Sequence, residues 1–170
     1  MAVDIAQVAH DVLADVGLPR SGCEDDGFRR LAEIVEVEIE YLSYGRLARG
    51  SVAVMAGDGG MGKSTVSQDF ATSVTRGHAL PSGTPGQPRS VVILTAEEDP
   101  RAVVRPRMRL MGADLERVFV HTAEEIALTL PSGGPLLADR CRQEEAGLVI
   151  IDTGPAFLDR GLKSNNEEDV

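Results

Sequence analysis

Nine consecutive residues, from Gly57 to Thr65, have the types and the spacing needed to hold a phosphate chain. They read Gly57-Asp58-Gly59-Gly60-Met61-Gly62-Lys63-Ser64-Thr65 and satisfy the pattern G-x-x-x-x-G-K-[ST] at every fixed position. Glycines let the backbone approach an anion closely, Lys63 can reach the β- and γ-phosphates, and the Ser64 hydroxyl can hold Mg²⁺. We therefore predict that Gly57 to Thr65 bind a nucleoside triphosphate, and that Lys63 also takes part in catalysis.

The segments on either side of this loop fit the same interpretation. Ser51 to Ala56 is a short apolar run, which predicts a buried strand, and Gly62 to Arg76 contains no Gly or Pro after its first residue, which predicts a helix. A strand, a glycine loop and a helix in this order surround a phosphate chain with backbone N–H groups and a helix N-terminus. The alternative, a glycine turn that binds no ligand, is disfavoured by these flanks.

A second motif supplies a carboxylate for the metal. Four apolar residues lead into an acid at Leu148-Val149-Ile150-Ile151-Asp152, which predicts a buried strand that delivers Asp152 to the edge of the sheet where the phosphates lie. Many strands end in an acid, so the motif is weak alone. Because it follows a complete glycine loop, we predict that Asp152 and Ser64 hold Mg²⁺.

A third acidic position follows the apolar run that ends at Leu94. Hydrolysis of a phosphoanhydride needs a group that orients the attacking water, and Glu97 is the first acid beyond this run, with Glu98 as the reserve. The alternative is that Glu97-Glu98-Asp99 caps the helix that follows, because acids are favoured at a helix N-terminus. Asp99, directly before Pro100, has the position of such a cap. The residues by themselves leave both roles open for Glu97.

The order of the apolar segments predicts an α/β fold. Strands are expected at 51–56, 91–94, 118–120 and 148–151, with helices over 62–76, 100–111 and 135–146, the last ending at Gly147. Continuous apolar strands separated by helices are typical of a mostly parallel sheet with helices on both faces. We predict an N-terminal helix and linker over residues 1–27 and this core over residues 28–170. The alternation of apolar residues with glutamates over Val35 to Tyr41 predicts a further strand with one solvated face.

Composition narrows the functional classes. A net charge of −10 argues against a chain that coats nucleic acid over its whole surface, although one local basic groove stays possible, and the absence of Trp makes stacking platforms scarce. No apolar run is long enough to span a membrane, and the N-terminus lacks the basic start of a secretory signal. Cys23 and Cys141 have no metal-ligand spacing and are expected as free thiols. We predict a cytoplasmic protein with no membrane partner.

Taken together, these motifs resemble the RecA-type AAA family ATPases related to the plasmid replicative helicase RepA. The resemblance covers roughly residues 40 to 170. It runs through the lead-in Tyr41–Gly50, the glycine loop, Arg76-Gly77, Ile93–Glu97, Arg105–Met108, Gly112-Ala113-Asp114, Asp152–Leu158 and Asn165–Val170. It implies a RecA-like P-loop NTPase fold that binds ATP and Mg²⁺, a ring-forming homo-oligomer, a possible DNA partner, and a task in DNA replication or mobile-element maintenance. It also favours Glu97 as the catalytic acid.

This chain departs from the family pattern in two places. Gly59 stands where relatives usually carry proline, and the chain ends at Val170, where relatives continue with a strand bearing a sensor group and with basic residues. The expected fold is therefore incomplete at the C-terminus. Two other functions are open on these grounds: a nucleotide-binding regulatory or assembly module without appreciable turnover, and a small-molecule kinase, which would need a basic lid. The arginines between Arg101 and Arg117 could follow a nucleic-acid backbone or form a solvated helix face.

Overall fold

The computed structural model describes residues 30–123 and 128–159 and shows an α/β fold built on a parallel sheet. The predicted N-terminal helix and linker, and the segment after Asp159, lie outside these residues. The strands are β1 (Tyr41–Ser43), β2 (Leu47–Ala48), β3 (Ser90–Thr95), β4 (Val118–Thr122) and β5 (Ala146–Asp152). The helical elements are η1 (Leu31–Glu33), α2 (Lys63–Arg76), η2 (Pro100–Val104), α3 (Arg105–Met111), η3 (Leu115–Arg117), α4 (Gly134–Gln143) and η4 (Gly154–Phe157).

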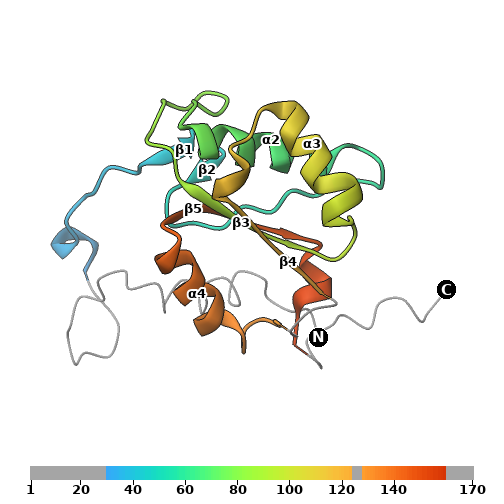
Figure 1. Cartoon of the computed structure of the whole chain (residues 1–170). Helices are drawn as coiled ribbons and strands as arrows, with labels where there is room; N and C mark the ends of the chain where they lie inside the picture. Colours follow the sequence, from blue (N-terminus) through green and yellow to red (C-terminus); the bar gives the residue numbers. More distant parts are fainter. Residues whose placement is uncertain (1–29, 124–127, 160–170) are drawn as a thin grey trace.

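The parallel sheet has the order β4-β3-β5, and helices cover both of its faces. In Figure 1, α2 and α3 lie on one side of the sheet and α4 lies on the other. The central strand β3 is buried at all six positions. Its side chains alternate, so that Val91 and Ile93 belong to the core beneath α2 and α3, whereas Val92 and Leu94 belong to the core beside α4. This two-sided burial explains why β3 is a continuous apolar run, and it confirms the predicted fold class.

Most of the predicted core elements are confirmed. The helix after the glycine loop begins at Lys63 and ends at Arg76, where Gly77 closes it with a left-handed backbone, φ 69°. The helical segment predicted over 100–111 is present as η2 followed directly by α3. The strands predicted at 91–94, 118–120 and 148–151 correspond to β3, β4 and β5. Local pattern was sufficient for these elements because each one packs its apolar side against the core.

The strand predicted at Ser51 to Ala56 is wrong in this structure. These residues form no strand, and they are exposed: the exposed fraction is 52% for Val52, 68% for Val54 and 46% for Met55. A strand is stabilised by pairing and by burial rather than by its own composition. None of the described strands pairs with this segment, so its apolar residues remain in solvent.

The strand predicted over Val35 to Tyr41 is also largely wrong. Only Tyr41 lies in a strand, the short β1, which pairs antiparallel with β2. Val35, Val37 and Ile39 are exposed by 83%, 83% and 59%, so the alternation with glutamates reflects a segment without a covering layer on either side. The small β1–β2 sheet is joined to the core by Leu42, which packs against the cluster beneath α2 and α3, and the hydroxyl of the buried Ser43 donates to the Pro81 carbonyl in the loop after α2 at 2.7 Å.

The helix predicted to end at Gly147 is shorter. It ends at Gln143, and Glu145 takes a left-handed backbone, φ 48°, before β5 begins at Ala146. Gly147 instead lies in β5, where the pairing with β3 shifts from Ser90 opposite Ala146 to Val91 opposite Leu148. A Cβ at Gly147 would stand 2.7 Å from the Cβ of Arg89. The glycine therefore serves a bulge with a close approach and not a helix terminus.

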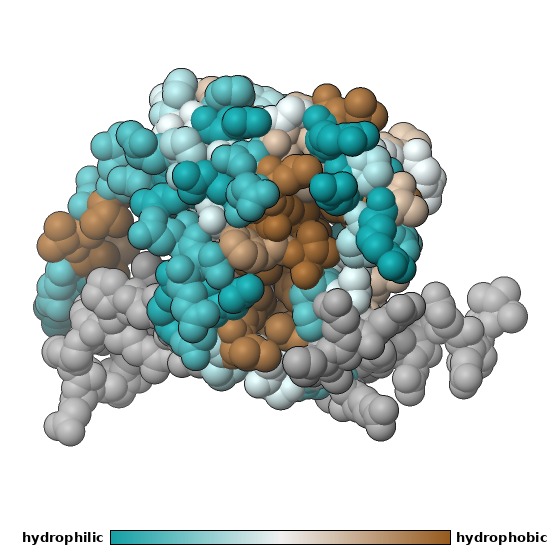
Figure 2. Space-filling view, in the orientation of Figure 1, coloured by the Kyte–Doolittle hydropathy of each residue, from teal (hydrophilic) through white to brown (hydrophobic). Residues whose placement is uncertain are grey.

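Both outer strands of the sheet leave apolar surface uncovered. On β5, Val149 and Ile151 are exposed by 37% and 38%, and on β4 Val120 is exposed by 36%. Figure 2 shows apolar surface across the middle of one face, in the region where Figure 1 places β4, with hydrophilic residues on both sides. Among the described residues, β4 and β5 each pair with β3 alone, so each has one open edge.

Candidate functional site

The glycine loop is open and has the backbone shape of an anion-binding turn. Gly60 and Gly62 have left-handed φ values of 77° and 81°, which a side chain would strain, and Gly62 is the residue that caps α2. A Cβ built at Gly59, Gly60 or Gly62 would meet no atom within 4 Å, so the space over the loop is free. The N–H groups of the first helical turn, at Lys63 and the two residues after it, have no intrahelical acceptor. They therefore face this free space as donors.

Lys63 is turned back onto the loop. Its Nζ donates to the carbonyl of Gly57 at 2.7 Å and to the carbonyl of Asp58 at 2.8 Å, and both bonds lie in an exposed environment. A Cβ at Gly57 would contact the Lys63 side chain at 3.9 Å, which shows how closely the lysine follows the loop. The ammonium group is thus held at the loop by two neutral carbonyls, which a phosphate oxygen could replace with a stronger, charged partner.

Asp152 lies at the carboxyl edge of the sheet, as predicted. It is the last residue of β5, opposite Thr95 at the end of β3, and its carbonyl accepts a hydrogen bond from the N–H of Ala96 at 2.8 Å. The Asp152 carboxylate accepts no hydrogen bond from the described residues. It is therefore available to a ligand beside the loop that leaves β3.

The three acids after β3 have three different environments. Asp99 caps η2, because its carboxylate accepts from the N–H groups of Arg101 at 2.7 Å and Ala102 at 2.8 Å. The hydrogen bond from Ala102, followed by that from Arg101, lowers the pKa of Asp99. Glu98 binds other side chains, whereas Glu97 is exposed and has no partner among the described residues. The cap prediction is confirmed for Asp99, and Glu97 is left free.

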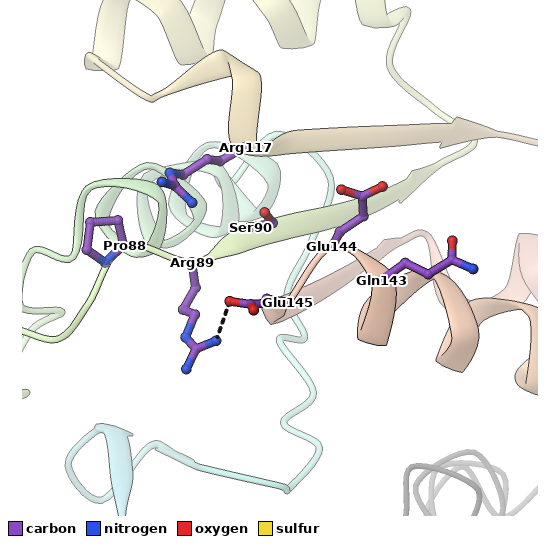
Figure 3. Close-up of a pocket in the computed structure, with 7 residues that line it drawn as sticks. All are labelled: Pro88, Arg89, Ser90, Arg117, Gln143, Glu144 and Glu145. Atoms are coloured by element: carbon purple, nitrogen blue, oxygen red, sulfur yellow. Dashed lines mark hydrogen bonds and ion pairs between the residues drawn. The ribbon is translucent and has the colours of Figure 1, made fainter.

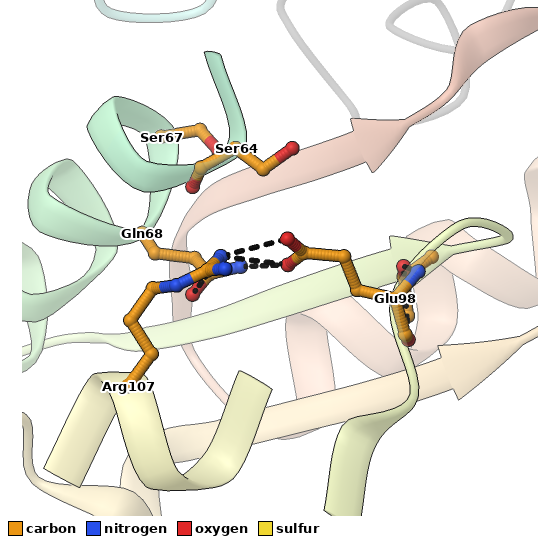
Figure 4. Close-up of polar contacts among 6 residues, drawn as sticks. Ser64, Ser67, Gln68, Glu98 and Arg107 are labelled. Carbon is orange, nitrogen blue, oxygen red and sulfur yellow. Dashed lines mark hydrogen bonds and ion pairs between the residues drawn. The ribbon is translucent and has the colours of Figure 1, made fainter. Parts of the chain in front are cut away.

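Glu98 is held by a cluster that the sequence did not reveal. Nη1 of Arg107 lies 2.8 Å from both carboxylate oxygens of Glu98, and the Gln68 amide nitrogen donates to one of these oxygens at 2.7 Å. Gln68 follows Ser64 by one turn of α2, which places both residues on the same side of the helix, and Figure 4 shows the Gln68 side chain at the Glu98 carboxylate. The spacing from Ser64 was the one available signal. Arg107 was indistinguishable from its exposed neighbours.

Contacts among these elements bring the predicted site residues to one region. Gln68 joins the glycine-loop helix to the loop after β3, and Ala96 joins that loop to Asp152 at the end of β5. Ser64 lies in the first turn of α2, above the Glu98 carboxylate in Figure 4. Ligands of open α/β sheets bind at this carboxyl edge. The predicted phosphate, metal and water-orienting residues therefore share one location in the fold.

A separate pocket of about 240 Å³ lies at the opposite, amino edge of the sheet (Figure 3). Its lining includes Arg89, Arg117 and Glu144, which precede the strands, and Arg89 pairs with Glu145 at 3.2 Å. The pocket holds charges of both signs that are exposed to solvent. It offers none of the loop N–H donors of the carboxyl edge, so it is not the phosphate site.

Comparison with known proteins agrees with this geometry. A family model described as AAA domain matches residues 22–170, which is most of the chain. The chain belongs to the AAA domain family. This family consists of P-loop ATPases, which generally bind ATP with Mg²⁺. Because the chain belongs to this family, its AAA domain is a nucleotide-binding ATPase domain. Neither the curated proteins nor the solved structures that were compared contain a match.

The polar side chains at the candidate site of this AAA domain suit Mg²⁺ better than a metal ion whose ligands all come from the protein. Over residues 30–123 and 128–159, no group of three or more His, Cys, Asp or Glu side chains could hold a metal ion. Magnesium is usually held by one or two protein ligands together with phosphate oxygens and water. The Ser64 hydroxyl and the Asp152 carboxylate fit that pattern. Within the same residues, no helix is both long and apolar enough to cross a membrane.

Proposed function

We propose that this chain is a Mg²⁺-dependent ATPase in which Glu97 orients the attacking water. The observation that carries this proposal is that the three acids after β3 make different contacts. Asp99 is used as a helix cap and Glu98 is bound by Arg107 and Gln68, so Glu97 is the one of these three acids whose carboxylate has no partner among the described residues. A group that accepts a proton from water must be free to reach it.

The other residues of the site have roles that follow from their positions. The loop Gly57 to Thr65 binds the phosphates through its N–H groups, and Lys63 exchanges its carbonyl partners for phosphate oxygens. Ser64 and Asp152 would hold Mg²⁺. When bound, this ion neutralises charge that develops on the phosphate oxygens. Glu97 would then hold a water molecule opposite the leaving phosphate and accept its proton.

We further propose that the ATPase works as a homo-oligomer on DNA, in replication or mobile-element maintenance, as the resemblance to RepA implies. The open edges of β4 and β5 and the exposed apolar residues near them support association between copies. The charge of −10 limits any DNA contact to a local surface. The free thiol of Cys141, whose pKa is raised by burial, is in keeping with a reducing, cytoplasmic setting.

Single-turnover ATP hydrolysis, measured with and without single-stranded DNA, tests this function. Glu97→Gln should lower the hydrolysis rate by about 10²–10⁴-fold, the usual contribution of a general base, and change the Kd for ATP by less than about threefold. Glu116→Gln is the matched control, because Glu116 is also an exposed acid whose carboxylate has no partner among the described residues.

The outcomes separate the candidate functions. Loss of hydrolysis in Glu97→Gln but not in Glu116→Gln supports the proposal. A wild-type protein that binds ATP and does not hydrolyse it would favour the alternative, a nucleotide-binding regulatory or assembly module. Unchanged hydrolysis in Glu97→Gln would return Glu97 to the helix-terminal role. Hydrolysis that does not respond to DNA would remove the DNA-directed part of the proposal.

A further inference from the structure

The side chains of Gln68, Glu98 and Arg107 form one closed polar cluster. Nη1 of Arg107 donates to both oxygens of Glu98 at 2.8 Å and to the Gln68 amide oxygen at 3.3 Å, while the Gln68 amide nitrogen donates to Glu98 at 2.7 Å. Gln68 is buried, and the side chains of Glu98 and Arg107 are exposed by only 19% and 29%. Each member contacts both of the others (Figure 4), so the arrangement has little freedom.

This cluster joins three elements that have to be aligned for hydrolysis. Gln68 belongs to α2, one turn after Ser64, Glu98 belongs to the loop after β3, and Arg107 belongs to α3. The Gln68 backbone is itself tied into α2, because its carbonyl accepts from the Thr72 hydroxyl at 2.9 Å. The cluster therefore connects the helix that begins at the phosphate loop to the loop that carries Glu97.

The residues on both sides of Glu97 are held, although Glu97 is not. The N–H of Ala96 donates to the Asp152 carbonyl at 2.8 Å, the N–H of Glu98 donates to the Thr95 hydroxyl at 3.3 Å, and Asp99 caps η2. Glu98 supplies the contacts that tie this short segment to α2 and α3. Without it, the direction in which Glu97 leaves the backbone would depend on two backbone contacts and one cap.

We propose that Gln68, Glu98 and Arg107 are positioning residues that hold Glu97 in line with the bound nucleotide, an inference that rests on the proposed ATPase function. A cluster that only stabilised the fold could lie at any place in the core. This one lies between the phosphate-loop helix and the water-orienting acid, where a displacement of about 1 Å can cost about 100-fold in rate. Its side-chain hydrogen bonds reach no residue of the loop Gly57 to Thr65, so it acts on turnover rather than on affinity.

The test compares Arg107→Met with Arg105→Met. Methionine keeps the length and the helix propensity of arginine but removes the donors. Arg105 is an exposed arginine at the start of the same helix, with no side-chain partner among the described residues. We expect Arg107→Met to lower kcat for ATP by about 10- to 100-fold, with KM and the Kd for ATP changed by less than about twofold. Arg105→Met should leave all three unchanged.

A second measurement shows whether the cluster acts through Glu97. In single-turnover assays, Arg107→Met introduced into Glu97→Gln should lower the remaining rate by less than about twofold, because the residue that the cluster positions has already lost its function. Arg107→Lys should recover part of the rate, since it restores one charged donor. Urea unfolding identifies a variant that does not fold, and Glu98→Gln, which keeps the side-chain volume, then takes the place of Arg107→Met.

Four results would overturn the proposal. The first is a normal kcat in Arg107→Met when the wild-type protein does hydrolyse ATP. This result would contradict the inference and leave the proposed ATPase function intact. The second is a double variant whose rate is the product of the two single effects, because the cluster would then act independently of Glu97. The third is a wild-type protein without hydrolysis, which removes the proposed function and this inference with it. A lower affinity for ATP with unchanged kcat would place the cluster in binding and would also contradict it.

Discussion

Replacement of Lys63 by alanine tests the phosphate site most directly, because this side chain is placed at the loop before any ligand arrives. Its Nζ donates to the carbonyls of Gly57 and Asp58 at 2.7 and 2.8 Å in an exposed environment. These bonds tie the lysine to the loop and involve no core residue. We expect Lys63→Ala to lower the affinity for ATP strongly and to leave the fold intact.

The size of the effect follows from an exchange of partners. A hydrogen bond to a charged group contributes about 1.5–3 kcal/mol, and a bond to a phosphate must replace bonds that the lysine already makes. The net loss on substitution is therefore about 1.5–3 kcal/mol, which corresponds to a rise in Kd of about 10- to 140-fold at 1.4 kcal/mol per factor of ten. The free energy of unfolding should change by no more than about 0.5 kcal/mol, as for other exposed positions.

Calorimetric titration with Mg²⁺-ATP measures the affinity, and urea unfolding measures the stability. Arg46→Ala is the control, because it removes an exposed positive charge from the turn between β1 and β2 and should leave the Kd unchanged. Equal ATP affinity in Lys63→Ala and wild type would refute the assignment of the loop. A large loss of stability in Lys63→Ala would refute the claim that the lysine contacts only an exposed loop.

Two other predictions concern the metal and the edges of the sheet. Asp152→Asn should weaken the dependence of ATP affinity on Mg²⁺ more than it weakens the ATP affinity measured without Mg²⁺, because the Asp152 carboxylate lies free at the carboxyl edge of the sheet. If titrations of the variant and the wild type show the same response to Mg²⁺, Asp152 is only the acid that ends β5. Val149→Lys should reduce concentration-dependent self-association in light scattering, because Val149 is 37% exposed on β5, which has an open edge among the described residues, and lysine opposes pairing at open edges. A wild-type protein that stays monomeric at every concentration would contradict the second prediction.

Several features of this protein depend on near neighbours in the chain, and the sequence determined them. The glycine loop is one, because its left-handed glycines and the helix that starts at Lys63 are set by adjacent residues. The cap at Asp99 is another, since its carboxylate reaches N–H groups only two and three residues further along. The strand β3 is a third, because a run that is apolar at successive positions needs burial on both faces.

Only the tertiary structure decided which apolar segments are paired and which acid is free. Ser51 to Ala56 has the composition of a strand, yet pairing requires a partner, and none of the described strands supplies one. Gly147 matched a helix end locally but serves the β5 bulge, because Arg89 approaches it from the loop before β3. The choice between Glu97 and Glu98 depends on Gln68 and Arg107, which lie 30 residues before Glu98 and 9 residues after it. Contacts between separate elements are set by how those elements pack, and no local pattern contains that information.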